Sequence, residues 1–211
     1  RSTGSLALRA RHRQRPVRGC VQPSRRAPWK GQHVLLEALR QLPGVHALIV
    51  GDALFDGDQE YAHSLRDRVA EAALHNRVHF LGFRSDGPAL MKAVDIVVHT
   101  STAPEPFGRM IVEGLLAQRP VVVTRATEII DSGMNGYLVD HNNSGQLVSA
   151  LQRLFDNPAE ARNLATFGRH MAVSRFDNTD VQSRVASVID AVSHESARRE
   201  SPAATSSVVE L

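Results

Sequence analysis

The sequence predicts an α/β domain of the Rossmann-like type, a parallel sheet with helices on both faces. Short apolar segments of strand length alternate with amphipathic segments of helical length, and the turns between them are short. The strand segments are apolar at consecutive positions, as in residues 47–50 and 120–123. Strands that are apolar on both faces are typical of a parallel sheet covered by helices on both sides.

The predicted elements begin at residue 32. The segment 32–43 places its apolar residues on one helical face, at positions 34, 35, 38, 39 and 42. The predicted strands are 46–52, 78–82, 95–101, 120–124 and 135–140. The helical segments that separate them are 58–74, 87–94 and 108–119, with one helical turn at 127–131. Helices alone follow, at 146–155, 159–172 and 180–193.

The positive charge of the chain is confined to its first thirty residues. The 211 residues carry a net charge of +3, but residues 1–30 hold eight arginines, one lysine and no acidic residue. The remainder holds 16 basic and 22 acidic residues, so it is mildly acidic. This balance has no nucleic-acid-binding signature, and we expect no nucleic acid among the partners.

The cysteine content and the hydropathy pattern exclude two further classes of protein. The single cysteine, Cys20, rules out a disulfide framework and a cysteine-based metal site. No apolar run approaches the ~18 residues that would span a bilayer. A lone thiol suits a reducing compartment, so the sequence predicts a cytoplasmic location.

Composition divides the chain into three parts. Residues 1–23 are rich in Arg, Ser, Gly and Pro without apolar periodicity, which predicts a disordered or irregular basic arm. An RNA-binding arm and an organelle transit peptide are the functional alternatives for it. Residues 24–195 form the predicted domain, and residues 196–211 a disordered tail. Because residues 19–24 make a poor strand pattern, we expect residues 1–22 to pack little.

The strongest site pattern lies where the predicted strand 95–101 runs through a loop into the helix 108–119. Ligands of open parallel sheets bind beyond the carboxyl ends of the strands. The first amides of a helix can bind an anion, because their N–H groups are unpaired and the helix dipole favours negative charge. Here these amides belong to Phe107, Gly108 and Arg109.

Two carboxylates flank that helix start. Glu105 precedes the helix, and Glu113 lies about one turn inside it among apolar neighbours. Such a carboxylate is expected to point away from the core, where it can accept hydrogen bonds from both hydroxyls of a ribose. The alternative for Glu113 is an ordinary solvent-facing residue.

Two other loops give weaker patterns. Gly51 follows a predicted strand and lets the backbone approach a ligand closely, but a plain turn explains it equally well. In residues 83–88, Ser85 or Asp86 can cap the next helix, which alone accounts for that loop. No Gly-x-Gly-x-x-Gly fingerprint is present, which argues against a dinucleotide-dependent dehydrogenase.

The segment PEPFGRMIVEGLLAQRPVVVT, residues 104–124, closely resembles the core motif of the family 4 retaining glycosyltransferases of GT-B fold, the glycosyl transferases group 1. Residues 24–31 resemble the element in which an arginine and a Lys-Gly pair precede a helix, with Arg25 and Lys30 at the matching positions. VHFLGF and EIIDSGMNGYLV also resemble family segments. The resemblance covers roughly residues 24 to 193 and implies the C-terminal, donor-binding half of such an enzyme.

The resemblance implies roles for the nucleotide and the sugar. Glu113 would bind the ribose of the donor, and Glu105 would lie near the transferred sugar. The amides of Phe107 and Gly108 would hold the sugar and the phosphate. The donor would be a nucleotide-diphospho sugar such as a UDP-sugar or GDP-mannose.

The resemblance also implies how charge is balanced without a cofactor. Arg25 and Lys30 would neutralise the diphosphate leaving group, so no metal is expected. The backbone near Phe83 and Arg84 would meet the base.

Two departures from the family qualify these expectations. The acceptor domain that should precede residue 24 is not in the chain, and it would bind the acceptor glycan, lipid or small molecule and make any peripheral membrane contact. We therefore expect the chain alone to transfer no sugar. Residues 124–128 lack the family's glycine pair and make a loop shorter by about three residues, so Arg125 cannot reproduce its close approach to the ligand.

A protein without enzymatic activity is the alternative interpretation of the sequence. The same fold would also suit a non-catalytic nucleotide-binding or interaction fragment. Titration with UDP and GDP would distinguish a domain that binds a nucleotide donor from one that has lost this binding.

Overall fold

The computed structural model describes residues 18–23, 26–105, 107–125, 127–176, 179, 182–183 and 185–190. Residues 1–172 form one compact unit and residues 173–211 a second. The first unit holds a six-stranded sheet in the order β3-β2-β1-β4-β5-β6, and every strand pair is parallel. The strands are β1 Arg18–Pro23, β2 Val45–Val50, β3 Val78–Gly82, β4 Ile96–His99, β5 Val121–Thr124 and β6 Tyr137–Val139.

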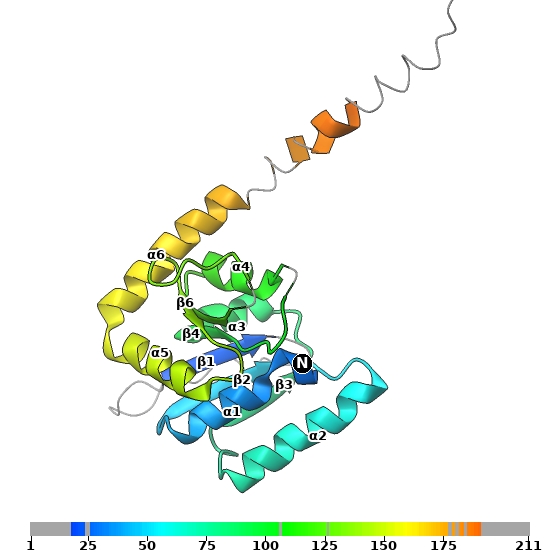
Figure 1. The fold of residues 1–211 in the computed structure, drawn as a ribbon, viewed down its shortest axis with the longest axis vertical. Coiled ribbons are helices and arrows are strands. Elements are labelled where there is room, and N and C mark those ends of the chain that lie inside the picture. The colour runs from blue at the N-terminus through cyan, green and yellow to red at the C-terminus, as the bar shows by residue number, and fades with distance from the viewer. Residues whose placement is uncertain are drawn as a thin grey trace, which may run out of the picture. The chain divides into compact units, whose positions relative to one another are not determined.

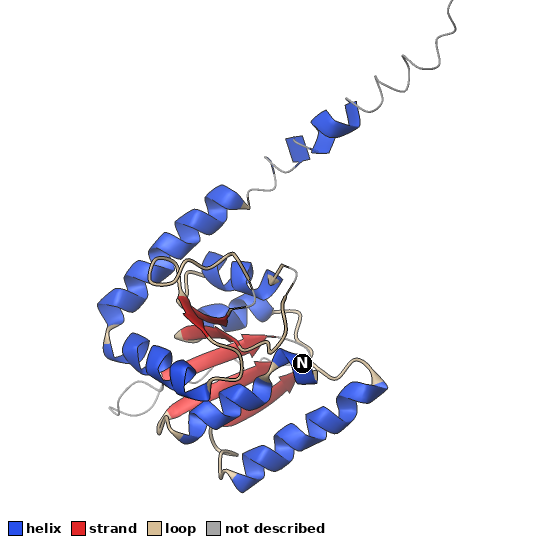
Figure 2. Ribbon diagram, in the orientation of Figure 1, coloured by secondary structure: helices blue, strands red, loops and turns tan. Residues whose placement is uncertain are grey.

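The helices cover both faces of this sheet, as Figure 1 and Figure 2 show. They are the short 3-10 helix η2 Pro28–Lys30, α1 Gln32–Arg40, α2 Asp56–Glu71, α3 Gly87–Ala93, α4 Arg109–Leu116, α5 Ser144–Asp156 and α6 Pro158–Arg175. Helix α1 packs against α2 and α5, whereas α3 packs against α4. The predicted Rossmann-like architecture is confirmed.

The centre of the sheet carries the core. Every residue of β4 and β5 is buried, because these strands have neighbours on both sides and helices on both faces. Leu35 and Leu39 of α1, with Leu147 and Leu151 of α5, are fully buried over the sheet. Burial of such a side chain stabilises the fold by about 1.5–3 kcal/mol.

Strand β1 corrects the predicted N-terminal boundary. It lies between β2 and β4, with Cys20 opposite Ile96 and Val21 opposite Val97. Cys20 and Val21 are fully buried, so the expectation that residues 1–22 pack little is wrong from residue 18 onward. The pattern was missed because this strand has only two consecutive apolar residues and depends on parallel neighbours far along the chain.

Other parts of the predicted organisation lie outside the described residues. These are the basic arm before residue 18, Arg25, and the tail from residue 196. In the second unit, residues 179, 182–183 and 185–190 are helical, as the pattern at 180–193 predicted. Among the helices that the structure describes, none has both the length and the apolar character needed to cross a membrane.

The predicted helical turn at 127–131 is wrong. Thr127 Oγ1 accepts a hydrogen bond from the Ile129 amide at 3.2 Å, and Asn135 Oδ1 accepts one from the Asp131 amide at 2.7 Å. Side-chain oxygens thus bind the amides that a helical turn would use. The segment is therefore irregular, although Ile129 and Ile130 are buried.

Gly31 permits the close packing of α1 on the end of β4. Its φ is +65°, and a Cβ there would lie 1.9 Å from the Thr100 carbonyl oxygen. We predict that Gly31→Ala lowers the free energy of unfolding by roughly 2–5 kcal/mol, from left-handed strain and overpacking. Urea unfolding measures this change.

Gly57 of α2 is the matched control for that substitution. A Cβ at Gly57 would meet nothing within 4 Å, so Gly57→Ala should leave stability unchanged or raise it. Equal unfolding midpoints for the two variants would contradict the steric argument.

Candidate functional site

A buried ion pair lies at the carboxyl edge of the sheet. Lys30, at the end of η2, donates to both carboxylate oxygens of Glu105, at 2.8 Å to Oε1 and 2.6 Å to Oε2. The two side chains are only 11% and 15% exposed. The sequence predicted both residues for the site, and the structure brings them into contact from positions 75 residues apart.

Two further side chains complete the surroundings of Glu105. His99, the last residue of β4, is 2% exposed and has its Nε2 atom 3.3 Å from Glu105 Oε2. Ser101 Oγ donates to the same carboxylate oxygen at 3.1 Å and lies 3.1 Å from His99 Nε2. Glu105 thus has hydrogen-bond partners from η2, from β4 and from its own loop.

These partners keep Glu105 ionised. The hydrogen bond with His99, together with the hydrogen bond and charge of Lys30, outweighs desolvation and lowers the pKa of Glu105 to about 2. Near neutral pH the group is a carboxylate held beside a lysine. It can accept hydrogen bonds and stabilise positive charge, but it has no proton to donate.

Two polar residues hold the backbone around this pair. Gln22 Nε2 donates to Thr100 Oγ1 at 2.7 Å and to the Lys30 carbonyl at 2.9 Å. Thr100 Oγ1 in turn donates to the Gly31 carbonyl at 2.8 Å. These bonds join the end of β1, the start of α1 and the end of β4.

The sequence patterns predicted no role for four residues that surround the ion pair: Gln22, His99, Thr100 and Ser101. Each is a polar residue near the carboxyl end of an otherwise apolar strand. This pattern indicates a shared site only once the strand order is known, because β1 and β4 are neighbours only in the folded sheet.

The start of α4 adjoins the ion pair. Gly108 is its N-cap residue, with φ of +71° and no side-chain cap on the helix. A Cβ on Gly108 would lie 3.8 Å from Glu105 Cγ, so the helix start is close to the Glu105 side chain. An uncapped helix N-terminus is suited to an anion.

Glu113 and Arg109 form a pair on the exposed side of α4. Arg109 Nε lies 3.1 Å from Glu113 Oε1, and the side chains are 87% and 34% exposed. Glu113 therefore points away from the core, as predicted. The sequence analysis assigned Arg109 a backbone role and did not foresee this ion pair.

The remaining predicted residues follow β2 and β3. Gly51 comes after β2, has a φ of +120°, and donates its amide to the Gly82 carbonyl at 2.7 Å. Phe83 is 78% exposed after β3. Arg84 is exposed and binds Asp86 through two hydrogen bonds of 2.8 and 2.7 Å. Because the strands are parallel, all three lie at the same edge as Glu105, but no contact joins them to it.

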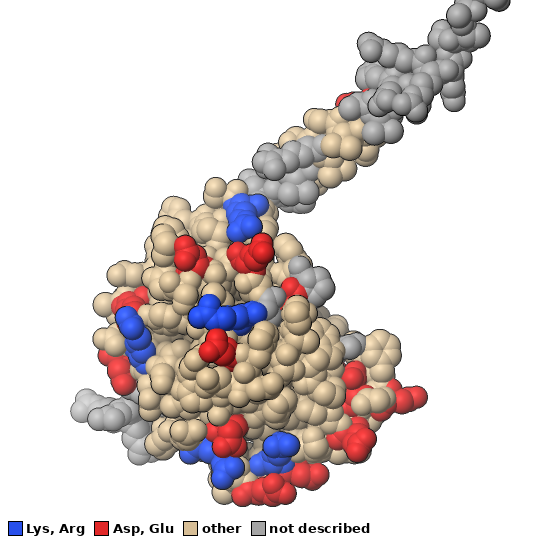
Figure 3. Space-filling model, in the orientation of Figure 1, with Lys and Arg blue, Asp and Glu red and all other residues tan. Residues whose placement is uncertain are grey.

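Among the described residues, no group of three or more His, Cys, Asp or Glu side chains could hold a metal ion. The face shown in Figure 3 carries basic and acidic side chains together and no basic patch. Arg125 and Asp140 form one ion pair, with Arg125 Nε 2.9 Å from Asp140 Oδ1.

The fold is that of a Rossmann-like domain with an ion pair close to an uncapped helix start at the carboxyl edge of its sheet. The chain belongs to the family described as glycosyl transferases group 1, whose model matches residues 19–171. It corresponds to the C-terminal domain of these GT-B proteins.

Curated relatives agree with this family. The chain is 30% identical over 150 residues to the lipopolysaccharide core biosynthesis glycosyltransferase LpsE of Rhizobium meliloti, covering 70% of this chain and 42% of that protein. It is 31% identical over 177 residues to the phosphatidyl-myo-inositol mannosyltransferase of Mycobacterium leprae, covering 78% and 44%. The chain thus spans less than half the length of these relatives.

Solved structures agree as well. Anabaena Alr3699/HepE in complex with UDP and glucose superposes with a TM-score of 0.80 at 41% identity, covering 82% of this chain and 48% of that one. The C-terminal domain of the group 1 protein LpcC from Francisella tularensis gives 0.70 at 28% identity, covering 76% and 87%.

The lowered pKa of Glu105 predicts an acid-dependent loss of stability. Because the pKa falls from 4.5 to about 2 on folding, the contribution is complete above the unfolded value and is lost as pH falls toward 2. We expect Glu105→Gln to cost about 2 kcal/mol near neutral pH, after allowance for screening, and progressively less below about pH 4.5. Urea unfolding at stepped pH measures the difference.

The exposed Glu128 provides the control, because Glu128→Gln should leave the pH dependence unchanged. A gap between wild type and Glu105→Gln that stays constant down to acid pH would refute the assignment.

Proposed function

We propose that this chain is the donor domain of a family 4 retaining glycosyltransferase and binds a nucleotide-diphospho sugar. The observation that carries the proposal is the Lys30–Glu105 pair against the uncapped start of α4. The lysine and the amide-rich helix end suit an anionic diphosphate, and the carboxylate suits the hydroxyls of a sugar.

The diphosphate would bind at the start of α4. The amides of Phe107, Gly108 and Arg109 would face its oxygens, and Lys30 and Arg25 would neutralise the charge that develops on the leaving group. Lys30 has three N–H donors, so it can keep Glu105 while contacting a phosphate. Two cations in place of a metal make the site metal-independent in this proposal.

The nucleoside would extend along the same edge of the sheet. Glu113 would accept from the ribose hydroxyls, since it lies one helical turn beyond the phosphate-binding amides and is partly exposed. The backbone near Phe83 and Arg84 would meet the base, and Gly51 would let the chain approach the ligand closely.

Glu105 would face the transferred sugar. Its low pKa leaves it ionised, so it would accept from sugar hydroxyls and stabilise a developing positive charge instead of acting as an acid.

A UDP-sugar is the donor we favour, with GDP-mannose as the alternative. The 41% identical HepE has been solved in complex with UDP-glucose, which supports the first. The similarity to a mannosyltransferase is the reason to keep GDP-mannose as the alternative donor. The acceptor, a glycan, lipid or small molecule, and any peripheral membrane contact would belong to an N-terminal domain of a cytoplasmic enzyme.

Calorimetric titration of the chain with UDP, UDP-glucose and GDP-mannose tests the donor site. We expect UDP-glucose to bind and no sugar transfer by these 211 residues alone, because transfer needs donor and acceptor fixed in one dry cleft. Absence of binding by every nucleotide would overturn the donor function and favour an interaction fragment. Sugar transfer by the chain alone to an added acceptor would contradict the proposal that a second domain is required.

Glu113→Gln tests the ribose contact. An amide accepts at only one of its two ends, and losing a hydrogen bond to a charged group costs about 1.5–3 kcal/mol, so affinity for UDP should fall roughly ten- to hundredfold. The melting temperature should not change, because an exposed ion pair such as Arg109–Glu113 adds little stability.

Glu60→Gln, at an exposed position on α2, is the control. If Glu113→Gln binds UDP with unchanged affinity, Glu113 is a solvent-facing side chain and does not contact the ribose. A fall in melting temperature together with affinity would indicate a structural residue instead.

A further inference from the structure

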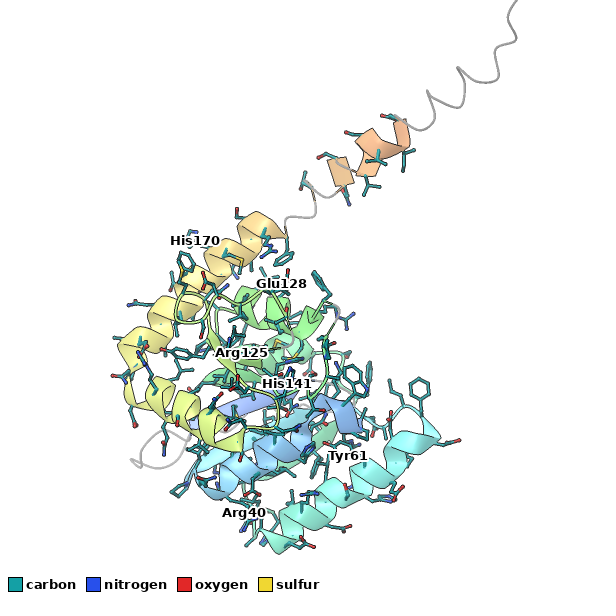
Figure 4. The ribbon with its side chains drawn as sticks, viewed as in Figure 1. Arg40, Tyr61, Arg125, Glu128, His141 and His170 are labelled. Atoms are coloured by element: carbon teal, nitrogen blue, oxygen red, sulfur yellow. The ribbon has the colours of Figure 1, made fainter. Side chains whose placement is uncertain are left out.

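His141 bridges two backbone carbonyls at the edge of the sheet. It follows β6, and its Nδ1 atom lies 2.9 Å from the Ser101 carbonyl oxygen while Nε2 lies 3.0 Å from the Arg125 carbonyl oxygen. Figure 4 shows His141 beside Arg125. Strands β4, β5 and β6 are neighbours in the sheet, so one imidazole links the three loops that leave their carboxyl ends.

Both ring nitrogens of His141 face hydrogen-bond acceptors. A carbonyl oxygen can only accept a hydrogen bond, and a neutral imidazole has a single N–H. The neutral ring therefore leaves a nitrogen lone pair against one of the two oxygens. Only the imidazolium donates to both carbonyls at once.

The Ser101 end of this bridge leads directly to the donor site. Ser101 Oγ donates to Glu105 Oε2 at 3.1 Å, and the Ser101 carbonyl also accepts from Thr124 Oγ1 at 2.7 Å. Ser101 is fully buried, so its backbone position fixes the hydroxyl that contacts the carboxylate.

The Arg125 end holds the loop that lacks a glycine pair. The Arg125 amide donates to the Val139 carbonyl at 3.0 Å, and Arg125 Nε donates to Asp140 Oδ1 at 2.9 Å. With His141 these contacts hold Arg125 against the loop after β6, where the sequence provides no glycine turn.

We propose that His141, as an imidazolium, ties the Ser101 and Arg125 carbonyls together and so positions the Glu105 loop for the donor sugar. His141 acts through Ser101 and is a positioning residue. The inference rests on the proposed donor function, since it assigns the sugar to the Glu105 loop.

Several charged and titratable groups lie near His141. Asp140 precedes it, and hydrogen bonds from Gln146 and Arg125 hold the pKa of Asp140 below its usual value, with a further contribution from His141. Asp140 thus remains an anion beside the ring. Glu105 lies beyond Ser101 with its Lys30 partner, and His33 of α1 contacts the neighbouring Asn142.

Hydrogen exchange tests the bridge without a ligand. We compare wild type with His141→Gln, which has one donor end and one acceptor end, and with His141→Arg, which donates in several directions at every pH. His141→Gln should lower the protection of the amides around residues 101–105 and 124–125. His141→Arg should retain more of it.

UDP-glucose binding tests the positioning. At one near-neutral pH, His141→Gln should bind UDP-glucose roughly two- to tenfold more weakly than wild type, as expected for one weakened hydrogen bond. His141→Arg, which can still donate to both carbonyls, should bind UDP-glucose more nearly as wild type does.

Bare UDP and an unrelated histidine provide the controls. At a fixed pH the His141 variants should bind UDP as wild type does, because the sugar contacts are absent. His170→Gln, on the exposed side of α6, should behave as wild type in every assay.

Each outcome decides between the alternatives. Weakened UDP-glucose binding by His141→Gln with UDP binding unchanged, and a smaller loss in His141→Arg, supports the inference. Unchanged exchange, or equal loss of UDP and UDP-glucose, overturns it while the donor function stands. If wild type binds no nucleotide sugar, the donor function fails and this assignment fails with it, whatever the exchange data show.

Discussion

The parallel pairing of β1 with β4 at the centre of the sheet is the contact on which the site depends. The two strands lie 76 residues apart at Cys20 and Ile96. Because they run in the same direction, the chain leaves both at one edge, where η2 brings Lys30 to the loop that carries Glu105. Side-chain hydrogen bonds then connect the two chain segments, from Gln22 to Thr100 and from Thr100 to the Gly31 carbonyl. The backbone of Gly31 also packs closely against Thr100.

This geometry makes the electrostatics of the candidate site part of the stability of the fold. A carboxylate and an ammonium that are this little exposed would be costly if either lost its partner, since a buried unpaired charge is strongly disfavoured. Glu105 does not depend on Lys30 alone, because His99 and Ser101 also bind it. The carboxylate is thus held in place in the structure without a ligand.

Hydrogen bonds to the loop after β6 hold the loop after β5. The segment from Arg125 onward has no glycine pair, and it is bound by Asp140 and His141. His141 also contacts the Ser101 carbonyl, at the end of β4. These residues follow three different strands, so their contacts exist only in the folded sheet.

The sequence by itself determined the Rossmann-like architecture, because apolar strands and amphipathic helices carry their pattern locally. It also pointed to Glu105, Lys30 and Glu113 one by one, through a motif and a resemblance. It could not predict β1, whose six residues have two consecutive apolar positions and become a strand only by pairing with β2 and β4. It mistook 127–131 for a helical turn, because the competing hydrogen bond to Asn135 comes from beyond the segment. The contacts of Lys30 with Glu105 and of His141 with two carbonyls join positions 16 to 75 residues apart. Only the tertiary structure decides such contacts, because strand order and parallel direction, and no local pattern, determine which chain segments meet at the edge of the sheet.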